Sequence, residues 1–233
     1  MLSWIRKLLR SSSQLPSGVV SIGEALSNPD IHSDPSTKAA FTQPEELDHF
    51  FDSYSFIQRP DWVGPMLDFL SKQDGIPMVA IAGLTGFLAE VINQNPSLDS
   101  EWNSKLTYAC PALRNLYAKA RELTPEAILQ MEPSTENNDL FWSAFRASGN
   151  LQYVGKVIDA MRLIEFGSDR GQLETGVSAK WSLAAHLQSF TQVHFYAMTT
   201  ASEREETVQK HLNDVLTKDV EAIKAESRQL LRR

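Results

Sequence analysis

The feature that most constrains this chain is the apolar stretch from Met78 to Ile92, which ends at the stop signal Asn93-Gln94-Asn95-Pro96. Read at helical spacing, it is apolar on nearly every side, and one side carries Gly83, Gly86 and a single carboxylate, Glu90. Such a helix is normally buried at the centre of a domain, and small side chains let a neighbouring backbone come close. The sequence therefore predicts a central helix over about 78–94, around which the other elements pack.

Helix-start signals recur along the rest of the chain, whereas sustained period-2 alternation and hairpin turns typical of strands are missing from the sequence. Proline or a capping residue begins helices near Thr42, Arg59, Pro111, Thr124 and Ser134, and Gly149 ends the last of these. The predicted fold class is therefore all-α. Short connections favour consecutive antiparallel helical hairpins, and a solenoid-like stack is the alternative, although no strict repeat period is found.

The second half of the chain predicts three further helices. One runs over 151–166, and the glycines at 167, 171 and 176 then mark an exposed loop before a long helix over 177–199. The last helix runs over 202–233, opened by a capping box between Ser202 and Glu205. Its apolar seam consists of Val208, Leu212, Val215, Ile223 and Leu230. Such a seam docks on its own domain or pairs with another helix, in a partner or in a second copy.

The N-terminal part divides from the rest by composition. The composition of residues 1–41 predicts a short basic amphipathic helix followed by a flexible arm rich in Ser, Pro and Gly. Residues 42–233 are predicted to form a single helical domain. The helix would contact a membrane or partner through Trp4, Ile5, Arg6, Lys7, Leu8, Leu9 and Arg10. Three interpretations stay open: docking on the body of the protein, binding at an anionic membrane surface, and a transit peptide. No stretch is long and apolar enough to cross a bilayer.

Composition and motifs narrow the chemistry. A net charge of −7 argues against a general nucleic-acid binder, and the single cysteine, Cys110, excludes an intramolecular disulfide and a cysteine-based metal cluster. His186 and His194 fall on one predicted helix, but eight residues separate them and no ligand lies between, so no metal is expected. Phosphate-binding loops, dinucleotide-binding glycine motifs and nucleophile elbows do not occur in the sequence, so neither a cofactor nor a catalytic residue is predicted.

Glu90 is the one acid that supports a chemical hypothesis. A buried carboxylate has a raised pKa and can act as a general acid or base, with Arg59, Arg146 and Arg162 as candidate counter-ions. The structural alternative is that Glu90 reaches solvent past the two glycines, or holds an arginine or a tryptophan N–H. We expect the structural role to be the correct one.

Two blocks of sequence resemble a poorly characterised family of bacterial all-helical proteins. The first contains Arg59-Pro60-Asp61-Trp62-Val63, then Gly86-Phe87-Leu88-Ala89-Glu90-Val91, Asn95-Pro96 and Trp102. The second runs from Asp139 to Asn150 and continues through Tyr153 to Ala160. The resemblance implies a helical fold and a bacterial origin, which disfavours the transit peptide. It implies no activity, cofactor or site residue.

These observations favour a non-enzymatic helical protein that binds another protein in the bacterial cytoplasm, as an inhibitor of the immunity type or an adaptor. The mild acidity and the lack of catalytic motifs agree with that hypothesis. Two alternatives are an enzyme that uses Glu90 and a protein bound at the membrane surface through residues 1–10. We expect no nucleic-acid partner, and self-association would use the C-terminal helix.

Overall fold

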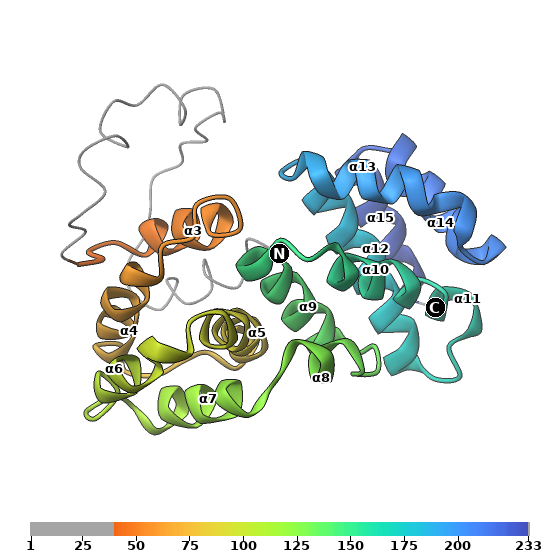
Figure 1. Cartoon of the computed structure of the whole chain (residues 1–233). Coiled ribbons are helices and arrows are strands. Elements are labelled where there is room, and N and C mark those ends of the chain that lie inside the picture. The colour runs from red at the N-terminus through yellow and green to blue at the C-terminus, as the bar shows by residue number, and fades with distance from the viewer. Residues whose placement is uncertain (1–39, 233) are drawn as a thin grey trace.

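The computed structural model describes residues 40–232, and every regular element within them is a helix (Figure 1). The first half contains α3 (Pro44–Ser53), α4 (Val63–Ser71), α5 (Met78–Gln94), α6 (Asp99–Ser104), α7 (Pro111–Glu122) and α8 (Pro125–Leu129). The second half contains α9 (Thr135–Ser148), α10 (Leu151–Ala160), α11 (Leu163–Phe166), α12 (Arg170–Leu187), α13 (Thr191–Thr200), α14 (Glu206–Thr217) and α15 (Val220–Leu230). Short 3-10 turns are η2 (Pro60–Trp62), η3 (Pro96–Leu98) and η4 (Ala201–Glu203). The all-α prediction is confirmed.

The predicted central helix is α5, with the bounds that the sequence indicated. Its first residues, Met78 and Val79, are exposed, and the stretch 83–92 is buried, including Gly86 and Glu90. A Cβ added at Gly86 would lie 2.4 Å from the backbone oxygen of Leu140 in α9, so α9 makes the close backbone approach expected beside the small residues. This contact fixes α5 against α9, its most extensive neighbour.

Aromatic side chains join α3 to α5. The Phe87 ring lies edge-on against Phe51 at a centroid distance of 4.5 Å, and against Tyr54 and Phe50 at 5.1 and 5.7 Å. Edge-to-face pairs of this kind stabilise beyond the area they bury. They form the core of the first group of helices, α3 to α7.

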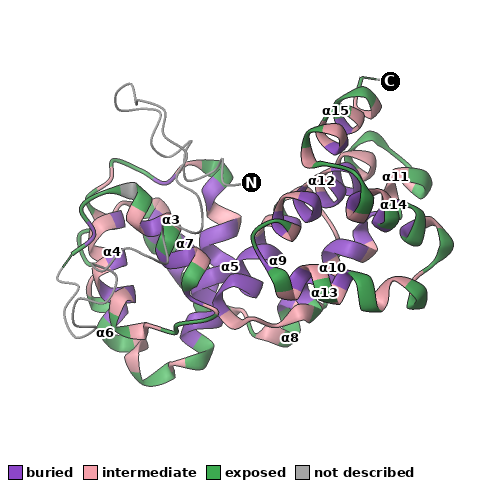
Figure 2. Cartoon of the chain, turned by 90° about the horizontal axis from the view of Figure 1, so that it is seen from above, coloured by how far each residue is buried: buried purple, intermediate pink, exposed green. Residues whose placement is uncertain are grey.

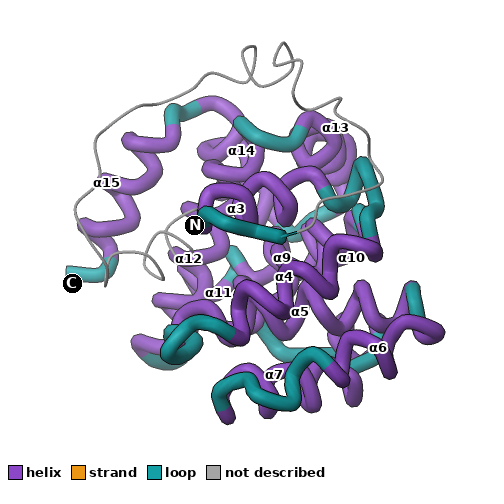
Figure 3. Tube along the Cα trace, turned by 90° about the vertical axis from the view of Figure 1, so that its left-hand side faces the viewer, coloured by secondary structure: helices purple, strands orange, loops and turns teal. Residues whose placement is uncertain are grey.

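The helices α10 to α15 form a second group on the other side of α9 (Figures 1 and 2). Within it α12 packs against α10, α11, α14 and α15, and Figure 3 shows α14 and α15 following one another over α12. Helix α9 joins the two groups, since it contacts α3 and α5 on one side and α10 and α12 on the other. Because the main partner of α5 is not adjacent in sequence, the hairpin and solenoid arrangements remain predictions.

The ends of α9 follow the sequence signals. The Ser134 hydroxyl accepts a hydrogen bond from the Asn137 N–H at 3.0 Å and so caps the first turn. At the other end Gly149 has φ of 72°, a conformation that favours glycine, and its N–H donates to the Phe145 carbonyl. Both boundaries are as predicted, and they hold α9 to the length that spans the two groups.

The prediction of an exposed loop at the three glycines is wrong for Gly171 and Gly176. Both lie inside α12, which begins earlier than predicted because the Asp169 carboxylate caps the Gln172 N–H at 2.9 Å. A Cβ at Gly176 would lie 2.7 Å from the Ile164 backbone nitrogen, so this glycine permits a helix contact. The predicted helix over 177–199 is likewise two helices that meet near Phe190, and the predicted helix over 151–166 ends at Ala160 and resumes as α11.

The single C-terminal helix predicted over 202–233 is also wrong. Ser202 belongs to η4, Glu205 is the N-cap residue of α14, and α14 ends at Thr217. Lys218 and Asp219 are extended, and the Asp219 carboxylate caps α15 by accepting from the Ala222 N–H at 2.7 Å. The break lets both short helices pack on α12, which one straight helix would not do.

Candidate functional site

Glu90 is buried inside the molecule and its carboxylate is occupied. One oxygen accepts a hydrogen bond from the Tyr153 hydroxyl of α10, and the other lies 3.5 Å from Nε2 of Gln94 on its own helix. Its relative exposure is 4%, so the escape to solvent past the glycines that the sequence allowed does not occur. Tyrosine, rather than the predicted arginine or tryptophan N–H, is the partner.

Burial raises the pKa of Glu90, and the hydrogen bond from Tyr153 opposes that rise. The three predicted counter-ions lie elsewhere: Arg59 pairs with Asp61, Arg146 approaches Asp52 at 3.3 Å, and Arg162 lines a surface pocket. Glu90 lines neither the pocket that contains Arg162 nor the one between α4 and Tyr108. A buried carboxyl whose two oxygens both have hydrogen-bond partners fits a structural role.

A second cluster of buried polar side chains is centred on His186 in α12. Its Nδ1 lies 2.8 Å from the Ser182 carbonyl oxygen, and its Nε2 lies 3.2 Å from an Arg146 nitrogen. The carbonyl requires a proton on Nδ1 and the guanidinium requires a lone pair on Nε2, so the ring is neutral. The Trp142 ring stacks on it at 3.7 Å, and the Trp142 N–H donates to the Ser182 hydroxyl at 2.9 Å.

Burial and then the charge of Arg146 lower the pKa of His186 well below 6.5. A neutral, stacked imidazole with both nitrogens engaged joins α9 to α12 and presents no lone pair to a metal or substrate. His194, predicted to share its helix, lies on α13 instead. In residues 40–232 no group of three or more metal-ligating side chains comes together.

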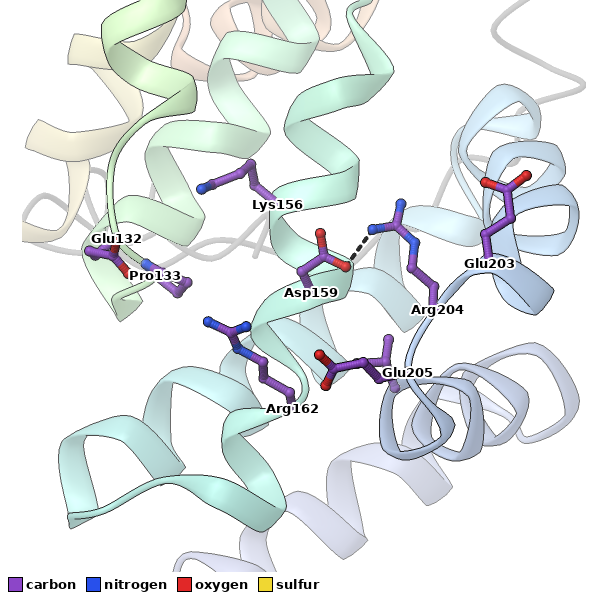
Figure 4. Close-up of a pocket in the computed structure, with 9 residues that line it drawn as sticks. Glu132, Pro133, Lys156, Asp159, Arg162, Glu203, Arg204 and Glu205 are labelled. Atoms are coloured by element: carbon purple, nitrogen blue, oxygen red, sulfur yellow. Dashed lines mark hydrogen bonds and ion pairs between the residues drawn. The ribbon is translucent and has the colours of Figure 1, made fainter.

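A surface pocket of about 390 Å³ lies between the segment before α9, α10 and the start of α14 (Figure 4). Lys156 and Arg162 extend toward the segment that carries Glu132, while Asp159 faces Arg204 and forms an ion pair with it. Arg204 also donates to the Tyr196 hydroxyl at 3.3 Å.

The complete lining is Glu132, Pro133, Lys156, Asp159, Arg162, Glu203, Arg204, Glu205 and Val208. Three cations and four carboxylates are mixed along it, which does not suit a phosphate backbone. Within the described part of the chain, Lys156 and Arg162 form no ion pair, so both are available to an incoming acidic group. The pocket therefore suits a surface that carries charges of both signs.

The outer side of α13 exposes large apolar side chains, and this helix adjoins the pocket through Tyr196. Phe195 and Met198, three residues apart, are 68% and 56% exposed, and between them Tyr196 contacts the pocket residue Arg204. Exposed apolar groups next to polar residues are a common feature of protein interfaces. Sequence reasoning did not single out either residue: both fall within the predicted helix over 177–199, and the sequence does not show which of its sides stays exposed.

The candidate partner residues of the C-terminal seam are largely covered by the chain itself. Val208, Leu212, Val215 and Ile223 are buried in the core, and Leu230 is half-buried. In this structure the seam docks on its own domain, which was one of the two interpretations left open. Association of two copies through the seam stays a prediction.

The candidate membrane contact at residues 4–10 lies outside the described residues, as does most of the predicted N-terminal arm. Within residues 40–232 the structure contains no helix with the length and hydropathy to span a bilayer. Peripheral contact through the N-terminal segment stays a prediction.

Comparison with known proteins identifies no relative of this chain. No protein-family model, no curated protein and no solved structure matches it.

Proposed function

We propose that this protein is a non-catalytic helical protein that binds another protein through the outer side of α13 and the adjoining charged pocket. The observation that carries the proposal is the exposure of Phe195 and Met198 beside the pocket lined by Lys156 and Arg162. Interfaces combine an apolar centre with a polar rim, and exposed aromatic residues supply much of their binding energy. The outer side of α13 offers the apolar side chains, and the pocket, which α13 adjoins through the hydrogen bond between Tyr196 and Arg204, offers the charges.

The buried polar groups support a non-catalytic function. Glu90 is bonded to Tyr153, and His186 is enclosed by Trp142 and Arg146, so the two groups that most resemble catalytic residues are used in packing. The partner we propose is a protein with both acidic and basic groups around an apolar anchor, as in an inhibitor or adaptor complex. The cellular location we propose is the bacterial cytoplasm.

The test uses a double variant, Phe195→Asp with Met198→Asp, in the full chain. A salt-resistant partner is first purified with the tagged protein, and its affinity is then measured by calorimetry against both forms. We expect binding to weaken about 30-fold or more, the scale for loss of an interface anchor. Circular dichroism should show unchanged helix content, because both side chains point to solvent.

The matched control is Tyr108→Asp in the connection before α7, where an aromatic side chain is 95% exposed and does not line this pocket. Its affinity should stay within about twofold of the unmodified protein. Equal weakening by the control and the double variant would contradict the proposed surface. An affinity unchanged in both would show that any partner binds elsewhere.

A further inference from the structure

Lys180 is the centre of a charged cluster that joins α12 to the two C-terminal helices. The side chain is buried, and its Nζ lies 2.6 Å from Oδ2 of Asp214 in α14 and 3.8 Å from Oε2 of Glu226 in α15. Lys218, between the two helices, contacts the other oxygens of the same carboxylates at 3.0 and 2.8 Å. One buried ammonium therefore holds both helices to α12.

His211 of α14 lies against this ammonium. Its Nδ1 is 3.4 Å from Nζ of Lys180. The ammonium donates the hydrogen bond, so Nδ1 can accept it only while Nδ1 is unprotonated and carries a lone pair. The residue is 5% exposed, and its Nε2 has no hydrogen bond among the described residues. The nearest acid to Nε2 is Glu165 of α11 at 3.6 Å, which Lys210 already binds at 2.9 Å.

The charges around a neutral His211 are balanced. The cations are Lys180, Lys210 and Lys218, and the carboxylates are Glu165, Asp214 and Glu226. A proton on His211 adds a fourth cation, and its Nδ1–H would then face the Lys180 ammonium. Two donors of like charge at this distance repel each other, and the repulsion is strong where water is excluded.

We propose that protonation of His211 releases α14 and α15 from α12, so that the C-terminal helix pair opens in mild acid. The imidazolium leaves the Lys180 ammonium and regains water by moving outward, and α14 moves with it. The opened pair uncovers Val208, Leu212, Val215 and Ile223, the apolar seam that now packs on the domain. Acid would thus expose a second surface for a partner helix.

The competing charges favour the neutral ring in the closed structure. Burial, and next the charge of Lys180, lower the pKa of His211, while Glu165 and Asp214 act in the opposite direction and Lys210 adds to the lowering. Glu165 does not fully offset the lowering of the His211 pKa, because water screens the charge of a half-exposed carboxylate. Closing the helix pair therefore expels a proton, and adding the proton favours opening.

The test is hydrogen–deuterium exchange of the full chain at about pH 7.5 and about pH 5, corrected for the intrinsic pH dependence of exchange. We expect amides of α14 and α15 to exchange about tenfold faster at the lower pH, while those of α5 and α9 stay protected. His211→Gln keeps an acceptor for Lys180 but does not titrate, so it should remove the pH effect. His194→Gln on α13 is the matched control and should retain it.

A second measurement requires no variant. Nuclear magnetic resonance titration of the unmodified protein follows the His211 ring and the backbone of α14 and α15, and opening requires that they share one midpoint below 6.5. If the ring titrates while the two helices stay protected, the side chain reorients without opening and the proposal is wrong. Acid opening that persists in His211→Gln would also overturn it.

Discussion

At the scale of single residues, Gly86 sets how closely α5 and α9 approach. Because an added Cβ would lie 2.4 Å from the Leu140 carbonyl oxygen, Gly86→Ala must push two buried helices apart. We expect the free energy of unfolding to fall by roughly 2–3 kcal/mol, the upper range for an overpacked core. Urea denaturation measures it.

The matched substitution is Gly75→Ala, in the connection before α5. No atom lies within 4 Å of the Cβ that it adds, and its φ is not positive. This variant should be neutral or more stable by up to about 1 kcal/mol, since alanine restricts the unfolded chain. If both variants lost the same stability, the cause would be glycine content in general and not the helix contact.

Glu90 is a residue whose charge the fold tolerates at a cost. Its pKa is raised, so the folded state gains stability as the pH falls and loses it as the pH rises through the folded pKa. At neutral pH, Glu90→Gln removes the buried charge and keeps an oxygen for Tyr153. We expect the free energy of unfolding to rise by on the order of 1 kcal/mol at pH 7, and the gain to vanish near pH 4.

Tyr153→Phe provides the opposite change in the same pair. It removes the hydroxyl and leaves the Glu90 carboxylate short of a donor, so stability should fall by about 1–3 kcal/mol at neutral pH. Chemical denaturation across pH 4 to 7 compares both variants. A lower stability of Glu90→Gln at pH 7 would show that the charge itself is needed there.

At the scale of elements, the C-terminal helix pair depends on a cap that separates its members. Asp219→Ala removes the acceptor of the Ala222 N–H and should lower the free energy of unfolding by about 1 kcal/mol. Glu221→Ala is the control, since that side chain is 77% exposed and forms an ion pair with Lys224 of its own helix. Its loss should stay below about 0.5 kcal/mol; comparable losses would mean that acidic charge, not capping, stabilises α15.

The element bounds show which sequence signals carry information. Helix α5 could be predicted because a proline begins an apolar run and an Asn-Pro pair ends it, so local chemistry and burial agree. The start of α12 could not, because Gly176 is read as a loop unless the approach of the Ile164 backbone is known. The break before α15 had a local signal in Asp219, which the continuing apolar seam concealed.

The site depends on contacts between distant parts of the sequence. The sequence singled out Glu90 correctly as buried, but Tyr153 lies 63 residues away and no local pattern pairs them. The cluster of Lys180 and His211 likewise forms only when α14 packs on α12. Local periodicity predicts which face is buried, and the three-dimensional fold then decides which polar groups meet on it.

At the scale of the whole molecule, α9 holds the two groups of helices together through polar as well as apolar contacts. Arg146 approaches Asp52 of α3 on one side and bonds to His186 of α12 on the other. The neutral state of His186 therefore matters for both groups. Protonation there would place an imidazolium against a guanidinium in the centre of the protein.

This arrangement makes the stability depend on pH in a direction that can be worked out. The pKa of His186 is lowered in the folded state. The stability that the neutral ring contributes is therefore complete at pH values above 6.5, the pKa in the unfolded chain, and is lost as the pH falls. The free energy of unfolding is compared between the unmodified protein and His186→Gln. Because the two proteins share every other titrating group, the difference reports on His186 alone. The advantage of the unmodified protein should shrink by about 1.4 kcal/mol per pH unit between about pH 6 and pH 5.

Guanidinium denaturation at three or four pH values measures that difference. His49→Gln serves as the control for the substitution itself, since that histidine is exposed on α3. A difference for His186→Gln that stays constant with pH would mean that the ring takes up its proton in the folded state as it does in the unfolded chain. Arg146 would then face a charged imidazole on the α12 side, and Asp52 of α3 would be its counter-ion on the other side.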